Sequence, residues 1–136
     1  MNHRATTPRV RGRLATLLFM ASLALPPAVA SALDASLPTA QLPVAGMVTM
    51  VDVGAAKCIP CKMMAPILED LAKQYQGRAV IAFVDVRLHP EMNERFRVKG
   101  IPTQIFYARQ GREVERHLGF LDREGIIKKL KQLNVN

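Results

Sequence analysis

Apolar residues along this chain follow two periodicities, one typical of buried strands and the other of amphipathic helices. Residues 48–53 and 79–84 are short runs rich in β-branched and other apolar residues, as expected for strands covered on both faces. Between these runs, apolar residues at helical spacing form one face of a predicted helix over residues 58–75: Met64, Ile67, Leu68, Leu71 and Tyr75. A strand, a helix and a strand in series predict a parallel pair joined by a right-handed crossover.

The second half of the chain continues this alternation. Pro90 suits the first turn of a short helix over residues 90–96. A glycine-containing turn at residues 109–112 predicts a hairpin, with strands over residues 103–108 and 113–117. Asp122 can cap a final helix, whose apolar face is Ile126, Ile127, Leu130 and Leu133. The order β-α-β-α-β-β-α predicts an α/β fold: one mixed sheet with helices on both faces.

The N-terminal segment has a different pattern, which is typical of an export signal. Four arginines precede an apolar stretch over residues 14–25, and two prolines end that stretch. Small residues around Ala30 and Ala32 fit the small-x-small cleavage rule, so we expect a signal peptide over residues 1–32. The alternative is an uncleaved membrane anchor. It is disfavoured because the prolines interrupt the run before the roughly 20 apolar residues that a spanning helix needs.

Three regions follow from these patterns. The signal peptide is followed by a loose lead-in over residues 33–46, which contains two prolines and a glycine, and by a folded domain over residues 47–136. If the signal is cleaved after Ala30 or Ala32, the mature protein is expected in the periplasm or an equivalent exported compartment.

Composition and charge narrow the possible functions. The 136 residues suffice for one domain, and an apolar fraction of 49% excludes disorder. The net charge of +8 suggests nucleic-acid binding until the charges are located. After residue 30 the chain holds 15 basic and 11 acidic residues, a formal charge of +4, and the two signs are interspersed. Without a basic stripe or interleaved aromatic residues, nucleic-acid binding is disfavoured.

The candidate chemistry lies at Cys58 and Cys61, between a predicted strand and a predicted helix. Unpaired backbone N–H groups and the helix dipole at a helix N-terminus stabilise a thiolate, and Lys57 and Lys62 add positive charge that would tune it further. The two-residue spacer allows Cys61 to attack a mixed disulfide formed at Cys58. We therefore predict a redox-active cysteine pair that needs no bound cofactor.

Other uses of the cysteine pair are possible. A structural disulfide that closes so small a ring removes little chain entropy and would stabilise the fold poorly. A zinc- or copper-handling module would need further ligands, and the histidines outside the signal are His89 and His117. Met63 and Met64 could serve copper, but methionines on an apolar helix face more often fill the core. A docking domain without catalysis is a third class. The redox interpretation is favoured, with a metal-binding module as the alternative.

Residues 48–133 closely resemble the thioredoxin family. The resemblance is carried by Val51-Asp52, Cys58-Ile-Pro-Cys-Lys62, Pro66, Gly100-Ile-Pro-Thr103 and Gly119. It implies the thioredoxin fold and action on protein disulfides, with Cys58 as the attacking nucleophile and Cys61 as the resolving thiol. It also implies that Asp52 is a buried acid that exchanges protons with Cys61, and that Pro102 is a cis-proline packed against the disulfide.

Further expectations combine this resemblance with the residues present. Asp52 lies in an apolar run, so burial should raise its pKa and equip it for proton transfer near neutral pH; the alternative is an aspartate at a strand end that reaches water. The residues expected to contact substrate are Ile59, Pro60, Ile101 and Gly119. Metal ligands are not expected.

The sequence also departs from the family pattern. Lys57 replaces the usual tryptophan before the first cysteine, Ile59 replaces a common glycine, and Phe83 stands where many members carry a buried lysine near the acid. The surface around the sulfurs should therefore be less aromatic and more cationic. Pro60 before the second cysteine resembles the reducing members, so we expect a reductase or isomerase. Because the protein is expected to be exported, we also expect a membrane protein to supply its electrons. The protein is expected to be a monomer.

Overall fold

The structure is a computed structural model that describes residues 39–136. The predicted signal peptide and the first part of the lead-in lie outside the described residues. In chain order the elements are η1 (Thr39–Gln41), β1 (Val48–Gly54), α1 (Ile59–Gln74), β2 (Ala79–Asp85), α2 (Glu91–Arg95), β3 (Thr103–Tyr107), β4 (Glu113–Leu118) and α3 (Arg123–Gln132). Each strand and helix predicted from periodicity is present, with ends that differ by at most one residue. Within the described range, no helix combines the length and apolarity required to cross a membrane.

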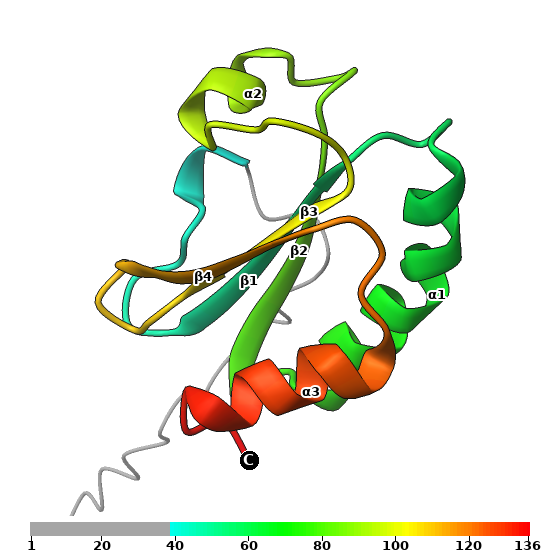
Figure 1. The fold of residues 1–136 in the computed structure, drawn as a ribbon. Coiled ribbons are helices and arrows are strands. Elements are labelled where there is room, and N and C mark those ends of the chain that lie inside the picture. Colours follow the sequence, from blue (N-terminus) through cyan, green and yellow to red (C-terminus); the bar gives the residue numbers. More distant parts are fainter. Residues whose placement is uncertain (1–38) are drawn as a thin grey trace, which may run out of the picture. The chain divides into compact units, whose positions relative to one another are not determined.

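The four strands form one mixed sheet in the order β2-β1-β3-β4 (Figure 1). β1 and β2 are parallel, as the strand-helix-strand pattern predicted. β3 is antiparallel to both β1 and β4, and the second of these pairs is the predicted hairpin. The register aligns Asp52 of β1 with Phe83 of β2 and with Gln104 of β3.

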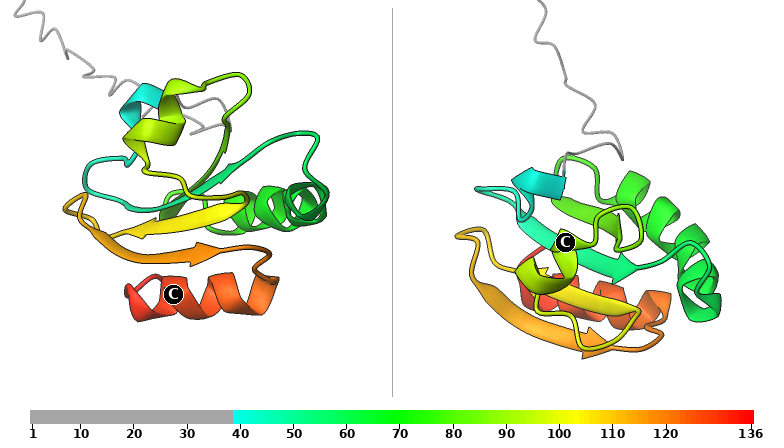
Figure 2. Two further views of the ribbon diagram at one scale, coloured as in Figure 1. Left: turned by 45° about the horizontal axis from the view of Figure 1, so that its top comes forward. Right: turned by 90° about the horizontal axis from the view of Figure 1, so that it is seen from above.

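Helices cover both faces of the sheet, which confirms the predicted α/β architecture. α1 and α3 pack on one face, and α2 packs on the other (Figures 1 and 2). Every residue of β1 is buried, because this central strand has helices above and below. Its alternate residues divide between the layers: Val48 and Met50 join the α1–α3 core, and Val51 and Val53 join the α2 core.

The N-terminal ends of the two longer helices are fixed by side-chain caps. α1 begins after Cys58, whose sulfur accepts a hydrogen bond from the Cys61 backbone N–H at 3.3 Å. The helix continues through Pro66, so this proline is accommodated within it, as the continuous periodicity indicated. α3 begins after Asp122, whose carboxylate accepts from the Gly125 N–H at 2.8 Å, which confirms the predicted cap.

The described part of the lead-in is held more tightly than its composition suggested. Leu42 is 1% exposed and packs in the α2 core. Arg95 of α2 donates hydrogen bonds to the backbone carbonyls of Thr39, Ala40 and Leu42 at 3.1, 3.1 and 2.6 Å. Residues 39–42 therefore belong to the packed domain, whose start precedes the predicted boundary at residue 47.

Candidate active site

The two cysteines form a disulfide at the N-terminal end of α1. Their Cα atoms lie 5.2 Å apart. Cys58 is half-buried, whereas Cys61 is only 3% exposed and lies in the first turn of the helix. A partner disulfide can therefore approach the Cys58 sulfur, while the Cys61 sulfur lies behind it.

The surroundings of Cys58 favour a thiolate when the pair is reduced. The sulfur lies at the positive end of the α1 dipole and already accepts the Cys61 N–H. Lys57 and Lys62 lie on either side of the cysteine pair with exposed side chains, so salt in the solvent screens their charges. The backbone of α1 therefore stabilises the thiolate at any salt concentration, whereas the contribution of the two lysines decreases as the salt concentration rises.

The loop before β3 brings a proline to the same end of the sheet. The Ile101–Pro102 peptide bond is cis, as the resemblance implied. Thr103 pairs with Val53, so Pro102 lies at the level of Gly54. A Cβ atom built on Gly54 would be 2.9 Å from the Cys61 sulfur, which shows that this end of β1 contacts the disulfide.

The four residues expected to contact substrate lie near the start of α1 or near the Pro102 loop, and two of them have exposed side chains. Ile59 is 74% exposed beside Cys58, and Ile101 is 36% exposed beside Pro102. Gly119 lies next to the proline loop, since its N–H donates to the Pro102 carbonyl at 2.8 Å. Its φ of +100° is a conformation that glycine adopts without strain. Pro60 is half-buried in the first turn of α1.

Asp52 is fully buried in β1, so the solvent-exposed alternative is rejected. Burial raises its pKa from 3.8 to about 6, and a hydrogen bond from Gln104 opposes part of that rise. The Gln104 Nε2 group donates to Asp52 Oδ1 at 2.8 Å. Asp52 and Gly54 are two residues apart on one face of β1, roughly 6.6 Å along the strand. The carboxyl group therefore shares the layer between β1 and α1 with the Cys61 sulfur.

Comparison with known proteins agrees with this geometry. Residues 40–132 match the family model Thioredoxin. This chain belongs to the thioredoxin family. The thioredoxin of Staphylococcus aureus is 40% identical over 83 residues, covering 61% of this chain and 79% of that protein. The thioredoxin of Staphylococcus saprophyticus is 39% identical over 85 residues, covering 62% and 81%.

Solved thioredoxin structures show the same fold. Chloroplastic thioredoxin z aligns with a TM-score of 0.63 at 27% identity, over 74% of this chain and 93% of that one. The germline-specific thioredoxin Deadhead of Drosophila melanogaster aligns with a TM-score of 0.58 at 31% identity, over 65% and 82%. Together with the cysteine pair, family membership makes this thioredoxin-family chain a thiol–disulfide oxidoreductase.

Gln104 is a site residue that sequence reasoning missed. It lies in a strand of otherwise apolar and β-branched residues, and it is fully buried. Its importance depends on the β1–β3 register, which places it directly beside Asp52. A glutamine inside a predicted buried strand is the signal that was available, because a buried amide requires a partner.

Phe83 lies on the other side of Asp52, on the edge strand β2. Its ring is 46% exposed, and the ring atom Cε2 would be 2.9 Å from a Cβ built on Gly54. The ring therefore covers the Cys61 end of β1. This chain consequently has an apolar side chain beside its buried acid, where the family resemblance implies a lysine in many members.

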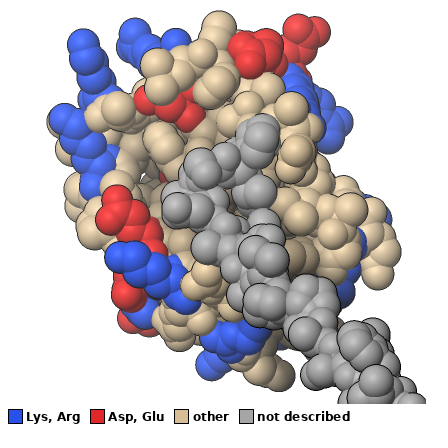
Figure 3. Space-filling model, turned by 180° about the vertical axis from the view of Figure 1, so that it is seen from behind, with Lys and Arg blue, Asp and Glu red and all other residues tan. Residues whose placement is uncertain are grey.

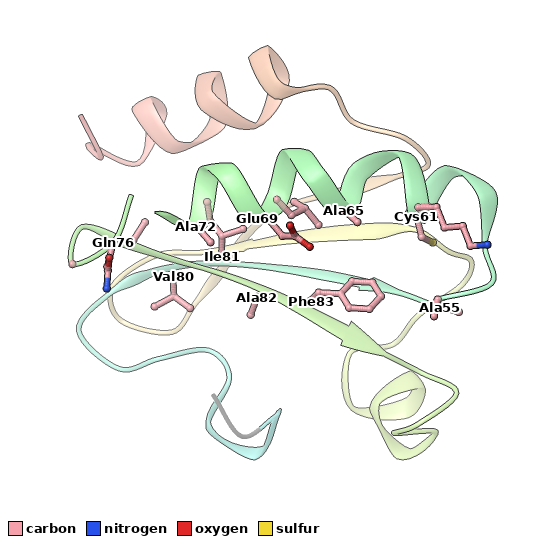
Figure 4. A pocket seen from close by; sticks show the side chains of 15 residues that line it. Ala55, Cys61, Ala65, Glu69, Ala72, Gln76, Val80, Ile81, Ala82 and Phe83 are labelled. Carbon is pink, nitrogen blue, oxygen red and sulfur yellow. The ribbon is translucent and has the colours of Figure 1, made fainter. Parts of the chain in front are cut away.

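A groove of about 490 Å³ runs between α1 and β2 and was not predicted from the sequence (Figure 4). Cys61, Ala55 and Phe83 lie at one end of this groove, and Gln76 lies at the other. Small side chains such as Ala65 form part of its helical wall.

The metal-binding alternative finds little support in the described residues. No group of three or more His, Cys, Asp or Glu side chains within residues 39–136 is arranged to hold a metal ion. His89 lies 3.5 Å from Glu91, and His117 Nε2 lies 3.1 Å from the Phe120 carbonyl. Neither histidine therefore joins the cysteine pair in a ligand group.

The surface charges of the described residues are interspersed, as expected. Figure 3 shows Lys and Arg side chains among Asp and Glu on one face of the molecule. Several charges are paired, including Arg116 with Glu113 at 2.8 Å and Lys129 with Glu115. Such pairing is typical of a solvated surface.

Proposed function

We propose that this thioredoxin-family protein is an exported reductase or isomerase of protein disulfides. The observation that carries the proposal is the unequal exposure of the two cysteines: Cys58 is half-buried and Cys61 is 3% exposed. This arrangement assigns attack to the accessible cysteine and resolution to the buried one. The exposed apolar side chains of Ile59 and Ile101 would contact a substrate polypeptide on either side of its disulfide.

The proposed reaction begins with the Cys58 thiolate. It attacks one sulfur of the substrate disulfide, which forms a mixed disulfide and releases the other substrate sulfur as a thiolate that solvent protonates. The Cys61 thiolate then attacks the Cys58 sulfur. The Cys58–Cys61 disulfide forms, the mixed disulfide breaks, and the second substrate thiolate leaves. Two electrons pass from the dithiol to the substrate, so no bound cofactor is required.

Asp52 is the proposed proton acceptor for the second step. Its carboxylate would take the proton from the Cys61 thiol, directly or through water, when that thiol becomes the nucleophile. A pKa of about 6 leaves Asp52 largely ionised at neutral pH, yet basic enough to accept a proton. Asp52→Asn should therefore slow the resolving step most near neutral pH. An unchanged pH–rate profile would reject this role.

Export is supported by the N-terminal sequence pattern. An arginine-containing start, an apolar stretch and small residues at the end form a signal peptide pattern. The mature protein should begin at Ser31 or Leu33 and occur in the periplasm. N-terminal sequencing of the mature protein tests this, and recovery of the intact chain in the membrane fraction would favour the anchor instead. An exported reductase also needs outside electrons, for which a membrane protein is the proposed donor.

The reducing direction is supported by Pro60, through its resemblance to reducing members. Lys57 and Lys62 act the other way, because they stabilise the thiolate and so favour oxidation of partners. Exposed charges contribute at most about 1 kcal/mol each, which is too little to move the pair into the oxidising class. Equilibration with glutathione measures the potential, and a value near the most oxidising members of the superfamily would overturn the assignment.

Substrate trapping tests the proposed function most directly. Cys61→Ala should hold substrates as mixed disulfides on Cys58, visible as adducts that a reductant releases. Cys58→Ser is the matched control and should hold none, because the remaining sulfur at Cys61 is buried. Equal trapping by both variants would contradict the assigned roles. Absence of trapping together with stoichiometric retained metal would favour the metal-binding module.

A further inference from the structure

We propose that Gln104 is the positioning residue for proton transfer at Asp52: its side-chain amide holds the carboxyl group in place in both protonation states. This inference rests on the proton-accepting role proposed for Asp52. It concerns a residue on a different strand, which contacts the acid and not the substrate.

The geometry places the amide against the acid in a fully buried position. Asp52 and Gln104 are both 0% exposed and are paired across β1 and β3. Gln104 Nε2 lies 2.8 Å from Asp52 Oδ1 and 3.4 Å from the sulfur of Met64 on α1. The two amide hydrogens therefore have one acceptor each. These contacts fix the amide between the sheet and the helix that carries the cysteines.

A primary amide is suited to an acid that gains and loses a proton. It carries donors on nitrogen and an acceptor on oxygen, whereas a carboxyl group is an acceptor when ionised and also a donor when protonated. Within the described residues, neither Asp52 Oδ2 nor Gln104 Oε1 has a hydrogen-bond partner. In the structure the amide nitrogen donates to Asp52 Oδ1, which is the contact that suits the ionised acid. Rotation of the amide would let its oxygen accept the hydrogen of the protonated acid.

The groups that face Asp52 from the neighbouring elements do not duplicate this role. Its neighbour on β2 is Phe83, which is apolar, and α1 contributes Met64 and the Cys61 thiol of the reduced protein. His117 on β4 is paired with Gln104, but its Nε2 lies at the Phe120 carbonyl. Burial and the Gln104 hydrogen bond are accordingly the two influences that set the pKa of Asp52.

The test measures the protonation of Asp52 in the oxidised protein, where the cysteines do not titrate. Carboxyl carbon NMR should give a pKa higher in Gln104→Met than in the wild-type protein by roughly one pH unit, because a hydrogen bond to the charged form is lost. Ile105→Val is the matched control, since it trims the adjacent residue on the opposite face of β3 and should leave that pKa unchanged. An unchanged pKa in Gln104→Met would overturn the proposal.

A second measurement needs no variant of Gln104. In the wild-type protein the Gln104 side-chain NH₂ resonances should shift with the pKa of Asp52, and in Asp52→Asn they should not. Resonances insensitive to pH would overturn the proposal even if Gln104→Met fails to fold.

Kinetics then separate this inference from the proposed function. The pH–rate profile of the resolving step should move with the pKa of Asp52 in Gln104→Met and stay in place in Ile105→Val. If Asp52→Asn has no kinetic effect, the proton-accepting role fails and this inference fails with it. If Asp52→Asn slows resolution but Gln104→Met leaves the profile in place, the positioning role alone is rejected.

Discussion

The two faces of the sheet are both covered by helices but differ chemically. Most of the face under α2 is apolar: Val51 and Ile105 pack with Met92 and Phe96, and buried threonine hydroxyls lie toward its two ends. The face under α1 and α3 is uniformly apolar at the end far from the disulfide. Toward the disulfide, its side chains include a carboxyl group, an amide and a sulfur. The α2 layer therefore stabilises the fold, and the α1 layer combines stability with chemistry.

This difference shows how an ionisable group can be kept in a core. Burying the Asp52 carboxyl group is energetically unfavourable. The strand register places Gln104 beside it, and the hydrogen bond from the Gln104 amide reduces this cost. On the opposite face, the neighbours of Val51 on the flanking strands are Ala82 and Ile105, and neither side chain can form a hydrogen bond. A polar group is tolerated where a partner stands beside it on the next strand.

The largest expected effect comes from moving the acid to the other face. Val51→Asp would place a buried carboxyl group between the apolar side chains of Ala82 and Ile105 and should lower the free energy of unfolding by about 4 kcal/mol or more. Urea denaturation measures this loss. Val51→Ala, which removes apolar contacts without adding a polar group, is the control and should cost about 2 kcal/mol. Equal losses in the two variants would contradict the contrast between the faces.

A smaller effect of opposite sign is expected from neutralising the native acid. The pKa of Asp52 is about 6 when folded and 3.8 in its ordinary state, so the folded protein binds this proton more tightly. Stability therefore falls as the pH rises from about 4 through 6. In the oxidised protein, Asp52→Asn should raise the free energy of unfolding by up to about 3 kcal/mol at pH 8 and have little effect below pH 4.

The control for this pH dependence is an exposed carboxylate. Asp70 forms a surface ion pair with Arg123, so Asp70→Asn should change stability by at most about 1 kcal/mol and should not stabilise the protein at pH 8. A stability gain in Asp52→Asn that is constant between pH 4 and 8 would contradict the raised pKa.

The smallest predicted effect concerns the space beside the resolving sulfur. Gly54→Ala would bring a Cβ atom to 2.9 Å from both the Cys61 sulfur and the Phe83 ring, and should cost about 2 kcal/mol through overpacking. Thermal unfolding of the oxidised protein measures it. Gly100→Ala is the matched control, because its nearest neighbour is the exposed and adaptable Leu118 side chain at 3.1 Å, and it should cost less. Equal losses would show that the close approach at Gly54 is not restrictive.

Much of the fold could be predicted because it depends on local sequence patterns. Helix caps at Cys58 and Asp122 and the apolar runs of β1 and β2 depend on neighbours within a few residues, so their elements were predicted closely. The cysteine pair and Asp52 were found for the same reason, since one motif and one polar residue in an apolar run identify them.

The features that were missed depend on contacts between distant residues. Gln104 acquires its role from a strand register, which requires the three-dimensional pairing of residues 52 apart. The docking of Leu42 depends on Arg95, whose three carbonyl contacts join segments more than 50 residues apart. The α1–β2 groove depends on the spacing of two elements and has no signature in either one alone.

The N-terminal cap of α1 links the mechanics of the helix to the redox couple. The atom that reacts, the Cys58 sulfur, is also the atom that caps the first turn. By thermodynamic linkage, if the thiolate stabilises the helical form of this turn, then formation of the turn stabilises the thiolate by the same free energy. Residues along α1 that strengthen or weaken the first turn therefore belong to the machinery that sets the redox equilibrium, although they never touch a sulfur atom. Helix propensity in this segment is a property on which natural selection can act to tune electron transfer.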